Sequence, residues 1–187
     1  MSRPGGDRLG PWTRLSRRSV YRNDWIEVFH DGVTRPDGSD GIYGVVHFHD
    51  RAVGVLPVDD AGRILLVGQF RYTLDEYSWE IPEGGVLAGE DQLAGAKREL
   101  AEETGFTATT WRLLVPTISL SNSVGDQTGS IFLASGLQPG EASPEPSEDI
   151  ALRWIRLEEG LAMIDAGEIN DSVTQVGLLQ YAVGQRP

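Results

Sequence analysis

A glycine-led segment runs into a short acidic stretch near the middle of the chain, and this junction constrains the fold and the chemistry more than any other feature. Glu99, Glu102 and Glu103 stand at positions i, i+3 and i+4, so a helix would carry their side chains on one face. Carboxylates at this spacing repel each other at a cost of roughly 0.2–0.5 kcal/mol per pair. A divalent cation with oxygen ligands would relieve the repulsion, whereas a solvated acidic helix face is the structural alternative.

The same stretch carries the signals of a bounded helix that can pack. Asp91 predicts the N-cap, and Gly105 predicts the C-terminal stop. An apolar stripe lies apart from the acids and consists of Leu93, Ala96 and Leu100. We therefore expect a short helix that packs through one side and presents its carboxylates on another.

The spacing around this helix resembles the Nudix box. Gly84 is followed after five residues by Glu90, and after seven more by Arg98-Glu99-Leu100-Ala101-Glu102-Glu103-Thr104-Gly105-Phe106. Every specified position of the box is matched. The resemblance extends from about Trp25 to about Tyr181 and looks most like the ADP-ribose and nucleoside-diphosphate-sugar pyrophosphatase branch. The motifs that support this branch lie at residues 68–72, 78–84 and 167–169.

Apolar patterns and turn signals along the rest of the chain predict an α+β fold. Two hairpins are expected, one from residues 25–33 and 41–49 and one from residues 52–58 and 63–70. Further strands are expected at 111–118, 130–134 and 150–157, and further helices at 158–166 and 171–183. The resemblance sharpens this to a Nudix α/β/α sandwich with a mixed sheet and N-terminal antiparallel strands. We expect an N-terminal extension and strand hairpin over residues 1–49, serving dimerisation and substrate contacts, and a hydrolase domain over 50–187.

The resemblance implies that the helix acids bind Mg²⁺, with Mn²⁺ as an alternative, beside the diphosphate of a substrate. The implied metal ligands are the side chains of Glu99, Glu102 and Glu103 and the main-chain carbonyl of Glu83. Such a cation neutralises phosphate oxygens, positions the attacking water and lowers its pKa. Arg98 is expected to orient one of the acids. Gly84 is expected to form a backbone turn that lets the loop approach the metal.

Residues outside the box are candidate substrate contacts, each with a structural alternative. Arg71 is a candidate phosphate clamp, because its planar guanidinium matches phosphate oxygens, or else a surface cation. Glu80 is a candidate contact to ribose or to an exocyclic amine, or else ties down the neighbouring loop. Trp25 is a candidate stacking platform for the base, or else part of the core. No carboxylate or cysteine completes a zinc pattern with the histidines, so they are read as structural: His30, His47 and His49.

Residues 120–127 depart from the pattern of similar pyrophosphatases. There the loop commonly ends in Asp-Glu, and the glutamate activates water or assists a metal, whereas this chain has Asp126 and Gln127. A glutamine cannot accept that proton. Either Asp126, Glu102 or Glu148 takes over the role, or hydrolysis is slow, or the loop only shapes the pocket.

Composition and charge limit the classes of partner that we expect this protein to bind. A net charge of −12 over 187 residues weighs against broad nucleic-acid binding, because phosphate backbones require surfaces rich in Lys and Arg. The absence of cysteine excludes disulfides and thiolate chemistry. No apolar run reaches the roughly 20 residues needed to cross a membrane. Since the start also lacks a signal-peptide core, we expect a cytoplasmic protein with no membrane partner.

Together these features predict a magnesium-dependent hydrolase that cleaves the diphosphate of ADP-ribose or of a nucleoside diphosphate sugar, giving a nucleoside monophosphate and a sugar phosphate. One alternative keeps the chemistry but takes dinucleoside polyphosphates or modified nucleotides. Another is a sensor that binds nucleotide sugars without cutting them, which Gln127 would explain. The resemblance also implies a homodimer, in which Trp25 would act across subunits.

Overall fold

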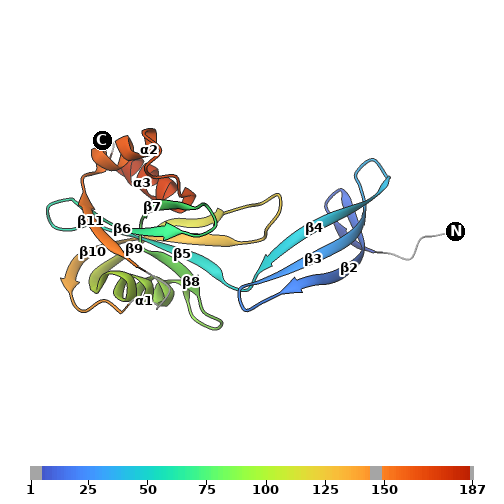
Figure 1. Ribbon diagram of the computed structural model, residues 1–187, viewed down its shortest axis with the longest axis horizontal. Coiled ribbons are helices and arrows are strands. Elements are labelled where there is room, and N and C mark those ends of the chain that lie inside the picture. Colours follow the sequence, from blue (N-terminus) through green and yellow to red (C-terminus); the bar gives the residue numbers. More distant parts are fainter. Residues whose placement is uncertain (1–5, 144–148, 186–187) are drawn as a thin grey trace. The chain divides into compact units, whose positions relative to one another are not determined.

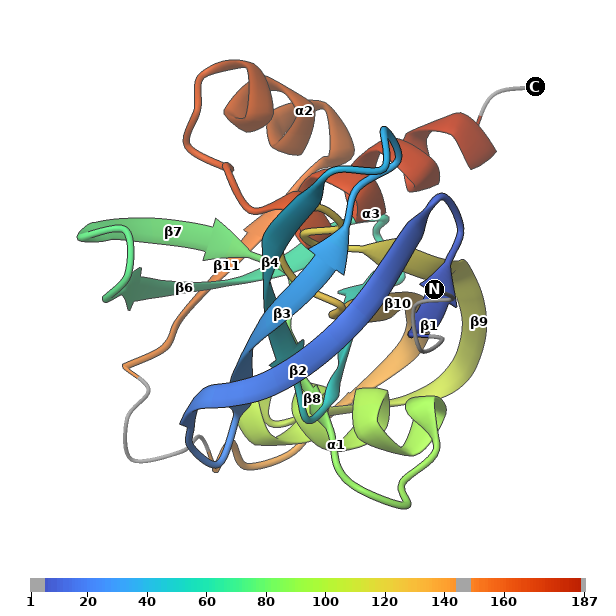
Figure 2. The ribbon, with the colours of Figure 1, turned by 90° about the vertical axis from the view of Figure 1, so that its right-hand side faces the viewer.

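The computed structural model describes residues 6–143 and 149–185, and the chain divides into two compact units. The first, called here the N-terminal unit, contains the residues up to Asp50 together with Ser119–Gln127. The second, called the helix-bearing unit, contains Arg51–Ile118 and the residues from Thr128 onward. Figures 1 and 2 show the elements of each unit from two directions.

The N-terminal unit is built on an antiparallel sheet in which each strand pairs with the next along the chain. Its strands are β1 (Asp7–Leu9), β2 (Trp12–Arg22), β3 (Ile26–Thr34) and β4 (Asp40–Phe48). Strands β3 and β4 form the first predicted hairpin, with Phe29 opposite Val45. The turn closes because Arg35 donates its main-chain N–H to the carbonyl of Ser39 at 2.8 Å. Strands β1 and β2 were not predicted.

The helix-bearing unit contains a mixed sheet and a smaller antiparallel sheet. The mixed sheet has the order β8-β5-β10-β9, and its strands are β5 (Arg51–Pro57), β8 (Glu83–Val86), β9 (Phe106–Ser119) and β10 (Thr128–Pro139). Within it, β5 runs parallel to β10 and antiparallel to β8. The smaller sheet has the order β11-β6-β7, and its strands are β6 (Ile64–Arg71), β7 (Glu76–Glu80) and β11 (Ala151–Ile155).

The second predicted hairpin is wrong, although its turn exists. Asp59 accepts the main-chain N–H groups of Ala61 and Arg63, so the chain does reverse there. However, β5 and β6 belong to different sheets and share only the isolated bridge between Val58 and Ile64. Each strand is already paired on both edges, β5 with β8 and β10 and β6 with β7 and β11, so no edge is left for a hairpin.

Helices cover the strands of this unit from two sides, with α1 on one side and α2 and α3 on the other (Figures 1 and 2). Their bounds are α1 (Gln92–Thr104), α2 (Leu157–Asp165) and α3 (Ser172–Gly184). The predicted ends of α1 are confirmed. Asp91 accepts the N–H groups of Leu93 and Ala94, and Gly105 adopts the left-handed conformation, φ 72°, as the C-terminal stop. The α/β/α expectation is thereby confirmed for this unit.

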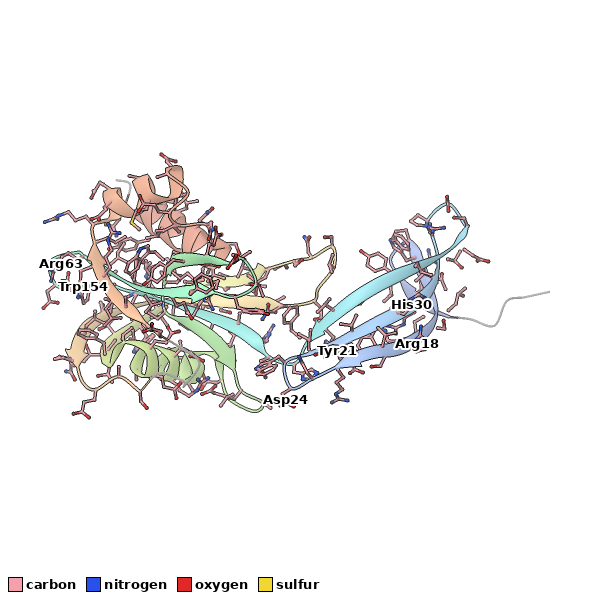
Figure 3. The ribbon with its side chains drawn as sticks, in the orientation of Figure 1. Arg18, Tyr21, Asp24, His30, Arg63 and Trp154 are labelled. Carbon is pink, nitrogen blue, oxygen red and sulfur yellow. The ribbon has the colours of Figure 1, made fainter. Side chains whose placement is uncertain are left out.

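The buried face of α1 fixes how its acids are presented. Ala96 and Leu100 are fully buried against Val53 and Val55 of β5. Burial of a leucine side chain contributes about 1.5–3 kcal/mol. Elsewhere in the unit, the Arg63 guanidinium lies 5.3 Å from the ring centroid of Trp154 (Figure 3). Since the apolar stripe points into the core, the glutamates of α1 are carried on another side of the helix.

Candidate functional site

Strand β8 lies against the first glutamate of the predicted metal site. A β-carbon at Gly84 would come closer than 3.0 Å to the carboxyl group of Glu99, which is nearer than real β-carbons approach any atom. The expected turn at Gly84 is wrong, because this glycine lies inside a strand and is not among the residues with positive φ. Its role is instead to leave room for the Glu99 carboxyl group.

Arg98 connects the acids of the box. Its Nη1 donates to Glu99 Oε1 at 2.7 Å and to Glu102 Oε2 at 3.0 Å. Its Nη2 donates to Glu90 Oε2 at 3.1 Å and to the carbonyl of Gly85 at 2.6 Å. The hydrogen bonds with the carboxylates of Glu90, Glu99 and Glu102 raise the pKa of Arg98, and the one with Glu90 has the largest effect. The geometry fits the expectation that Arg98 orients the acids.

Glu103 is held directly on strand β8. Its side chain is buried, and its Oε2 accepts the main-chain N–H of Glu83 at 3.1 Å. The carboxylate of Glu103 therefore lies next to the main chain of Glu83, whose carbonyl oxygen is an expected metal ligand. Helix α1 and strand β8 thus bring together Glu83, Glu99, Glu102 and Glu103.

Arg71 and Glu80 form an ion pair, also within the helix-bearing unit. Arg71 Nε donates to Glu80 Oε1 at 2.8 Å, and Arg71 Nη2 contacts Glu80 Oε2. Glu80 is 2% exposed and the Arg71 side chain is 34% exposed. The hydrogen bond with Glu80 raises the pKa of Arg71. Both oxygens of Glu80 therefore contact Arg71, the last residue of β6.

The side chain of Glu83 contains a buried oxygen without a hydrogen-bond partner among the described residues. Its Oε1 lies 3.3 Å from Arg71 Nη2, while its Oε2 is shielded from solvent. Burial raises the pKa of Glu83, and so do the nearby carboxylates of Asp171 and Glu80, although Arg71 opposes them. Sequence reasoning missed this side chain, and Asp171, because nothing local indicates which carboxylates converge.

These residues have the donor chemistry of a hard divalent cation. The donors are all oxygens, and one of them, the buried Glu83 Oε2, has no hydrogen-bond partner among the described residues. In the described ranges, no three acidic or histidine side chains already converge at metal-holding distances. Mg²⁺ does not require such a cage, because it commonly keeps several waters and uses one or two carboxylates together with substrate phosphates. The residues present therefore fit Mg²⁺.

Three predicted site residues belong to the N-terminal unit. Trp25 is 71% exposed, which excludes its reading as a core residue. Asp126 has both oxygens engaged, by His47 Nδ1 at 2.6 Å and by the main-chain N–H of Phe48 at 3.0 Å. Burial acts to raise the pKa of Asp126, but these hydrogen bonds outweigh it and lower that pKa. The main-chain carbonyl of Gln127 accepts the main-chain N–H of Leu120.

Glu148 and the histidines are the other residues that the sequence singled out. Glu148, named as a possible replacement for the missing glutamate, lies outside the described residues. His47 was read as structural because no carboxylate partner was evident, yet its partner Asp126 lies 79 positions along the chain. His30 lies on β3 in the N-terminal sheet (Figure 3). No helix in the described part of the chain is long and apolar enough to cross a membrane.

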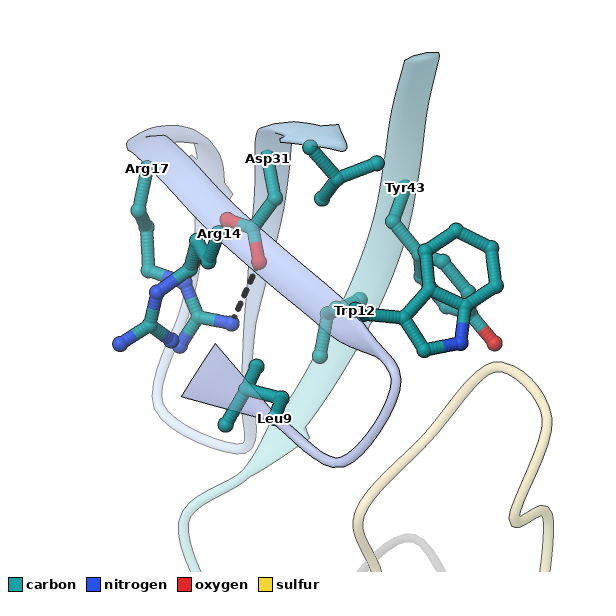
Figure 4. Close-up of a pocket in the computed structure, with 8 residues that line it drawn as sticks. Leu9, Trp12, Arg14, Arg17, Asp31 and Tyr43 are labelled. Carbon is teal, nitrogen blue, oxygen red and sulfur yellow. Dashed lines mark hydrogen bonds and ion pairs between the residues drawn. The ribbon is translucent and has the colours of Figure 1, made fainter. Parts of the chain in front are cut away.

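A cavity of about 210 Å³ opens on one face of the N-terminal sheet (Figure 4). Its lining residues come from all strands of that sheet and are Leu9, Trp12, Arg14, Arg17, Asp31, Val33, Tyr43 and Val45. Within it, Arg17 Nε and Nη2 donate to the two oxygens of Asp31, each at 2.8 Å. None of the predicted site residues lines this cavity, so it is a feature of the sheet and not of the carboxylate site.

Comparison with known families identifies the class of protein. The NUDIX domain family matches residues 48–175, and the family described as the nucleoside diphosphate sugar hydrolase N-terminal domain matches residues 12–46. The chain therefore belongs to the Nudix family of pyrophosphohydrolases. Enzymes of this family generally use a divalent metal.

Individual relatives narrow the comparison. The chain is 35% identical over 169 residues to the ADP-ribose pyrophosphatase of Mycobacterium tuberculosis, which covers 88% of this chain and 80% of the relative. It is 32% identical over 171 residues to the ADP-ribose pyrophosphatase of Bacillus subtilis, covering 89% of this chain and 90% of the relative. The crystal structure of an ADP compounds hydrolase matches with a TM-score of 0.84 and 20% identity, covering 96% of both chains. This last likeness supports the fold.

Proposed function

We propose that the protein hydrolyses the diphosphate bond of ADP-ribose or of a nucleoside diphosphate sugar in a Mg²⁺-dependent reaction. The products would be a nucleoside monophosphate and a sugar phosphate. The observation that carries this proposal is the junction of α1 with β8, where Glu99 fills the space left by Gly84 and Glu103 accepts the N–H of Glu83. This arrangement gathers hard oxygen donors on one side of a short, capped helix.

Each residue of the junction has a role in the proposed reaction. Glu99, Glu102, Glu103 and the main-chain carbonyl of Glu83 would hold the metal, with Mn²⁺ as a possible substitute. When bound, the metal neutralises phosphate oxygens and lowers the pKa of the attacking water. Arg98 fixes the orientation of Glu99 and Glu102 through hydrogen bonds of 2.7 and 3.0 Å.

Arg71 would bind a phosphate oxygen of the substrate. The hydrogen bonds from Nε and Nη2 to Glu80 fix the plane of the guanidinium group, and about one-third of the side chain is exposed. A guanidinium held in this way loses little conformational entropy when it binds an anion. Glu80 therefore supports the clamp, and the contact to substrate is assigned to Arg71.

The substrate class rests on the relatives and on the N-terminal match. Two of the relatives are ADP-ribose pyrophosphatases, and the N-terminal family is described by nucleoside diphosphate sugar hydrolysis. The 71% exposed Trp25 offers a flat apolar surface on which a nucleobase could stack. These observations favour sugar nucleotides over dinucleoside polyphosphates.

We also propose a cytoplasmic homodimer. Large apolar side chains are exposed on the N-terminal strands and on the turn between β2 and β3: Leu9, Leu15, Val20, Tyr21, Trp25 and Ile42. Apolar side chains that form one contiguous exposed patch are typical of surfaces that bind another protein, and the dimer proposal requires that these do so. Elution mass compared with the 20.4 kDa monomer tests this, and a monomer would leave Trp25 to act within its own subunit.

Phosphate release in a phosphatase-coupled assay tests the reaction. The panel contains ADP-ribose, ADP-glucose, GDP-mannose and a dinucleoside polyphosphate, each with Mg²⁺ and with EDTA. We expect release from the sugar nucleotides only when Mg²⁺ is present, with a sugar phosphate among the products. Release from the polyphosphate alone would identify dinucleoside polyphosphates, and not sugar nucleotides, as the substrates. Binding of sugar nucleotides without any product would support the sensor that Gln127 suggests.

A further inference from the structure

The segment Ser119–Gln127 is bound to the end of strand β4. Val46 donates its main-chain N–H to the carbonyl of Val124 at 2.9 Å, and Asp126 donates its own to the carbonyl of Val46 at 3.2 Å. Tyr43 contributes a third bond, from its hydroxyl to the carbonyl of Ser123 at 2.8 Å. The segment therefore extends the hydrogen bonding of the N-terminal sheet, and it falls in the same compact unit.

Asp126 closes this attachment with its side chain. Oδ1 accepts the main-chain N–H of Phe48 at 3.0 Å, and Oδ2 lies 2.6 Å from Nδ1 of His47. The two residues that hold the carboxylate are adjacent on β4, so the carboxylate bridges consecutive positions of one strand. At Gly125, a β-carbon would stand 3.1 Å from the ring of Phe48, so the preceding residue also leaves little space.

Each oxygen of Asp126 therefore already has a hydrogen-bond partner within its own unit. A general base must have an oxygen directed at the water or hydroxyl whose proton it removes. An exposed His–Asp pair contributes little by itself, and both side chains are about half exposed here. Combined with the bonds of Val46 and Tyr43, however, the pair fixes the last turn of the segment immediately before Gln127.

We propose that His47 and Asp126 are positioning residues, which hold the segment Ser119–Gln127 on strand β4 and thereby fix where Gln127 is presented. The inference rests on the proposed hydrolase function and on the resemblance to pyrophosphatases in which the corresponding loop activates water, assists a metal or shapes the pocket. It assigns a role to a histidine that has no metal-binding pattern in the sequence. It also assigns Asp126 a positioning role, so that Asp126 is not the general base that replaces the missing glutamate.

Hydrogen–deuterium exchange of the full-length protein measures the attachment without any need for turnover. His47→Ala and Asp126→Ala should each accelerate amide exchange in residues 119–127 by about tenfold or more, because local opening becomes less costly. His47→Asn should restore protection, since its side-chain amide nitrogen can occupy the place of Nδ1. The matched control is His49→Ala, because the His49 ring lies 5.9 Å from that of His47 and its Nδ1 faces the carbonyl of Asp24.

Turnover of ADP-ribose then separates positioning from catalysis. His47→Ala and Asp126→Ala should lower kcat by about tenfold with little change in KM, because misplacement affects the reacting geometry. Asp126→Asn keeps an acceptor for the N–H of Phe48 and should retain most of the wild-type kcat, whereas the loss of a general base would make it as inactive as Asp126→Ala.

Specific outcomes would overturn the proposal. Unchanged exchange in both alanine variants would show that the pair does not hold the segment. Faster exchange with unchanged kcat would show that its position is irrelevant to the reaction, and an inactive Asp126→Asn would return Asp126 to the role of base. If the wild-type protein itself turned over none of the substrates, the hydrolase function would fail, while the exchange data would still decide the attachment.

Discussion

The carboxyl group of Glu99 occupies the space into which a side chain at Gly84 would project. Strand and helix are thus in direct contact through an acid that the proposed reaction requires. The contact explains why a residue without a β-carbon stands at this point of an otherwise ordinary strand.

Gly84→Ala should therefore displace Glu99 while the fold persists. We expect kcat to fall by about 100-fold, since small displacements at a reacting centre have effects of this size. Overpacking should cost about 1–3 kcal/mol in the free energy of unfolding. Steady-state kinetics and urea unfolding measure the two effects. Gly44→Ala is the matched control, because a β-carbon there meets no atom within 4 Å, and wild-type kinetics for Gly84→Ala would contradict the assignment.

Glu103→Gln should abolish metal-dependent turnover without unfolding the protein. The amide oxygen can still accept the N–H of Glu83, but the charge that attracts a cation is removed. A loss on the order of 100-fold or more is expected in kcat, because metal-ion catalysis is worth several kcal/mol. Mn²⁺ binding, followed by electron paramagnetic resonance, should weaken in parallel. The exposed Glu158→Gln provides the control, and unchanged turnover in Glu103→Gln would remove α1 from the site.

Arg71→Ala should destabilise the protein, because it leaves the buried carboxylate of Glu80 without its partner. Breaking such a pair typically costs 3–5 kcal/mol, and the partial exposure of Arg71 reduces our expectation to about 2–3 kcal/mol. A double-mutant cycle with Glu80→Gln, measured by urea unfolding, isolates the coupling. A cost below about 0.5 kcal/mol would identify Arg71 as an ordinary surface cation.

Stability should fall in acid because of Asp31. The hydrogen bonds from Arg17 lower the pKa of this carboxyl group, although burial opposes them. A depressed folded-state pKa contributes stability above the unfolded value of about 3.9 and loses it as the pH falls through the folded value. Urea unfolding between pH 7 and pH 2.5 should therefore show a decline at the acid end. Asp31→Asn should be less stable at pH 7 and should show a shallower decline; an equally steep decline would assign the effect to other acids.

Gln127→Glu tests the departure from the pattern of similar enzymes. If the glutamine limits hydrolysis, a carboxylate at this position should raise kcat by about tenfold or more, within the range that general bases contribute. Gln127→Ala serves as the comparison, because it removes the amide without adding a base. Equal rates for all three proteins would mean that this position only shapes the segment.

The helix at the site could be predicted closely because its determinants are local. Asp91 caps the N–H groups of the next turn and Gly105 takes the left-handed conformation, and both signals lie within a few residues of the ends they set. The resemblance to the Nudix box added which glutamates of this helix are expected to bind the metal. The position of β8 was not predicted, because a four-residue strand that begins with an acid and two glycines has no apolar alternation.

Longer-range relationships could not be predicted in the same way. Strands β5 and β6 are adjacent in sequence and look like a hairpin, yet partners far along the chain, β10 and β11, take up their edges. Strand β2 carries several exposed charged side chains, so its strand character comes from pairing with β3 and not from an apolar pattern. The contact of His47 with Asp126 depends on both strand register and loop path, which single-sequence patterns do not encode.

Arg98 has a consequence for how the protein is assembled. Its guanidinium already compensates Glu90, Glu99 and Glu102, so the acidic side of α1 contains an internal counter-ion when the helix packs. Many small metal-binding domains, by contrast, remain unfolded until the ion binds, because their site is not formed without it. Under the proposed function, the folded chain would accumulate first and bind its cation afterwards. Free Mg²⁺ would then control how much of the protein is active, while the amount of folded protein would stay the same.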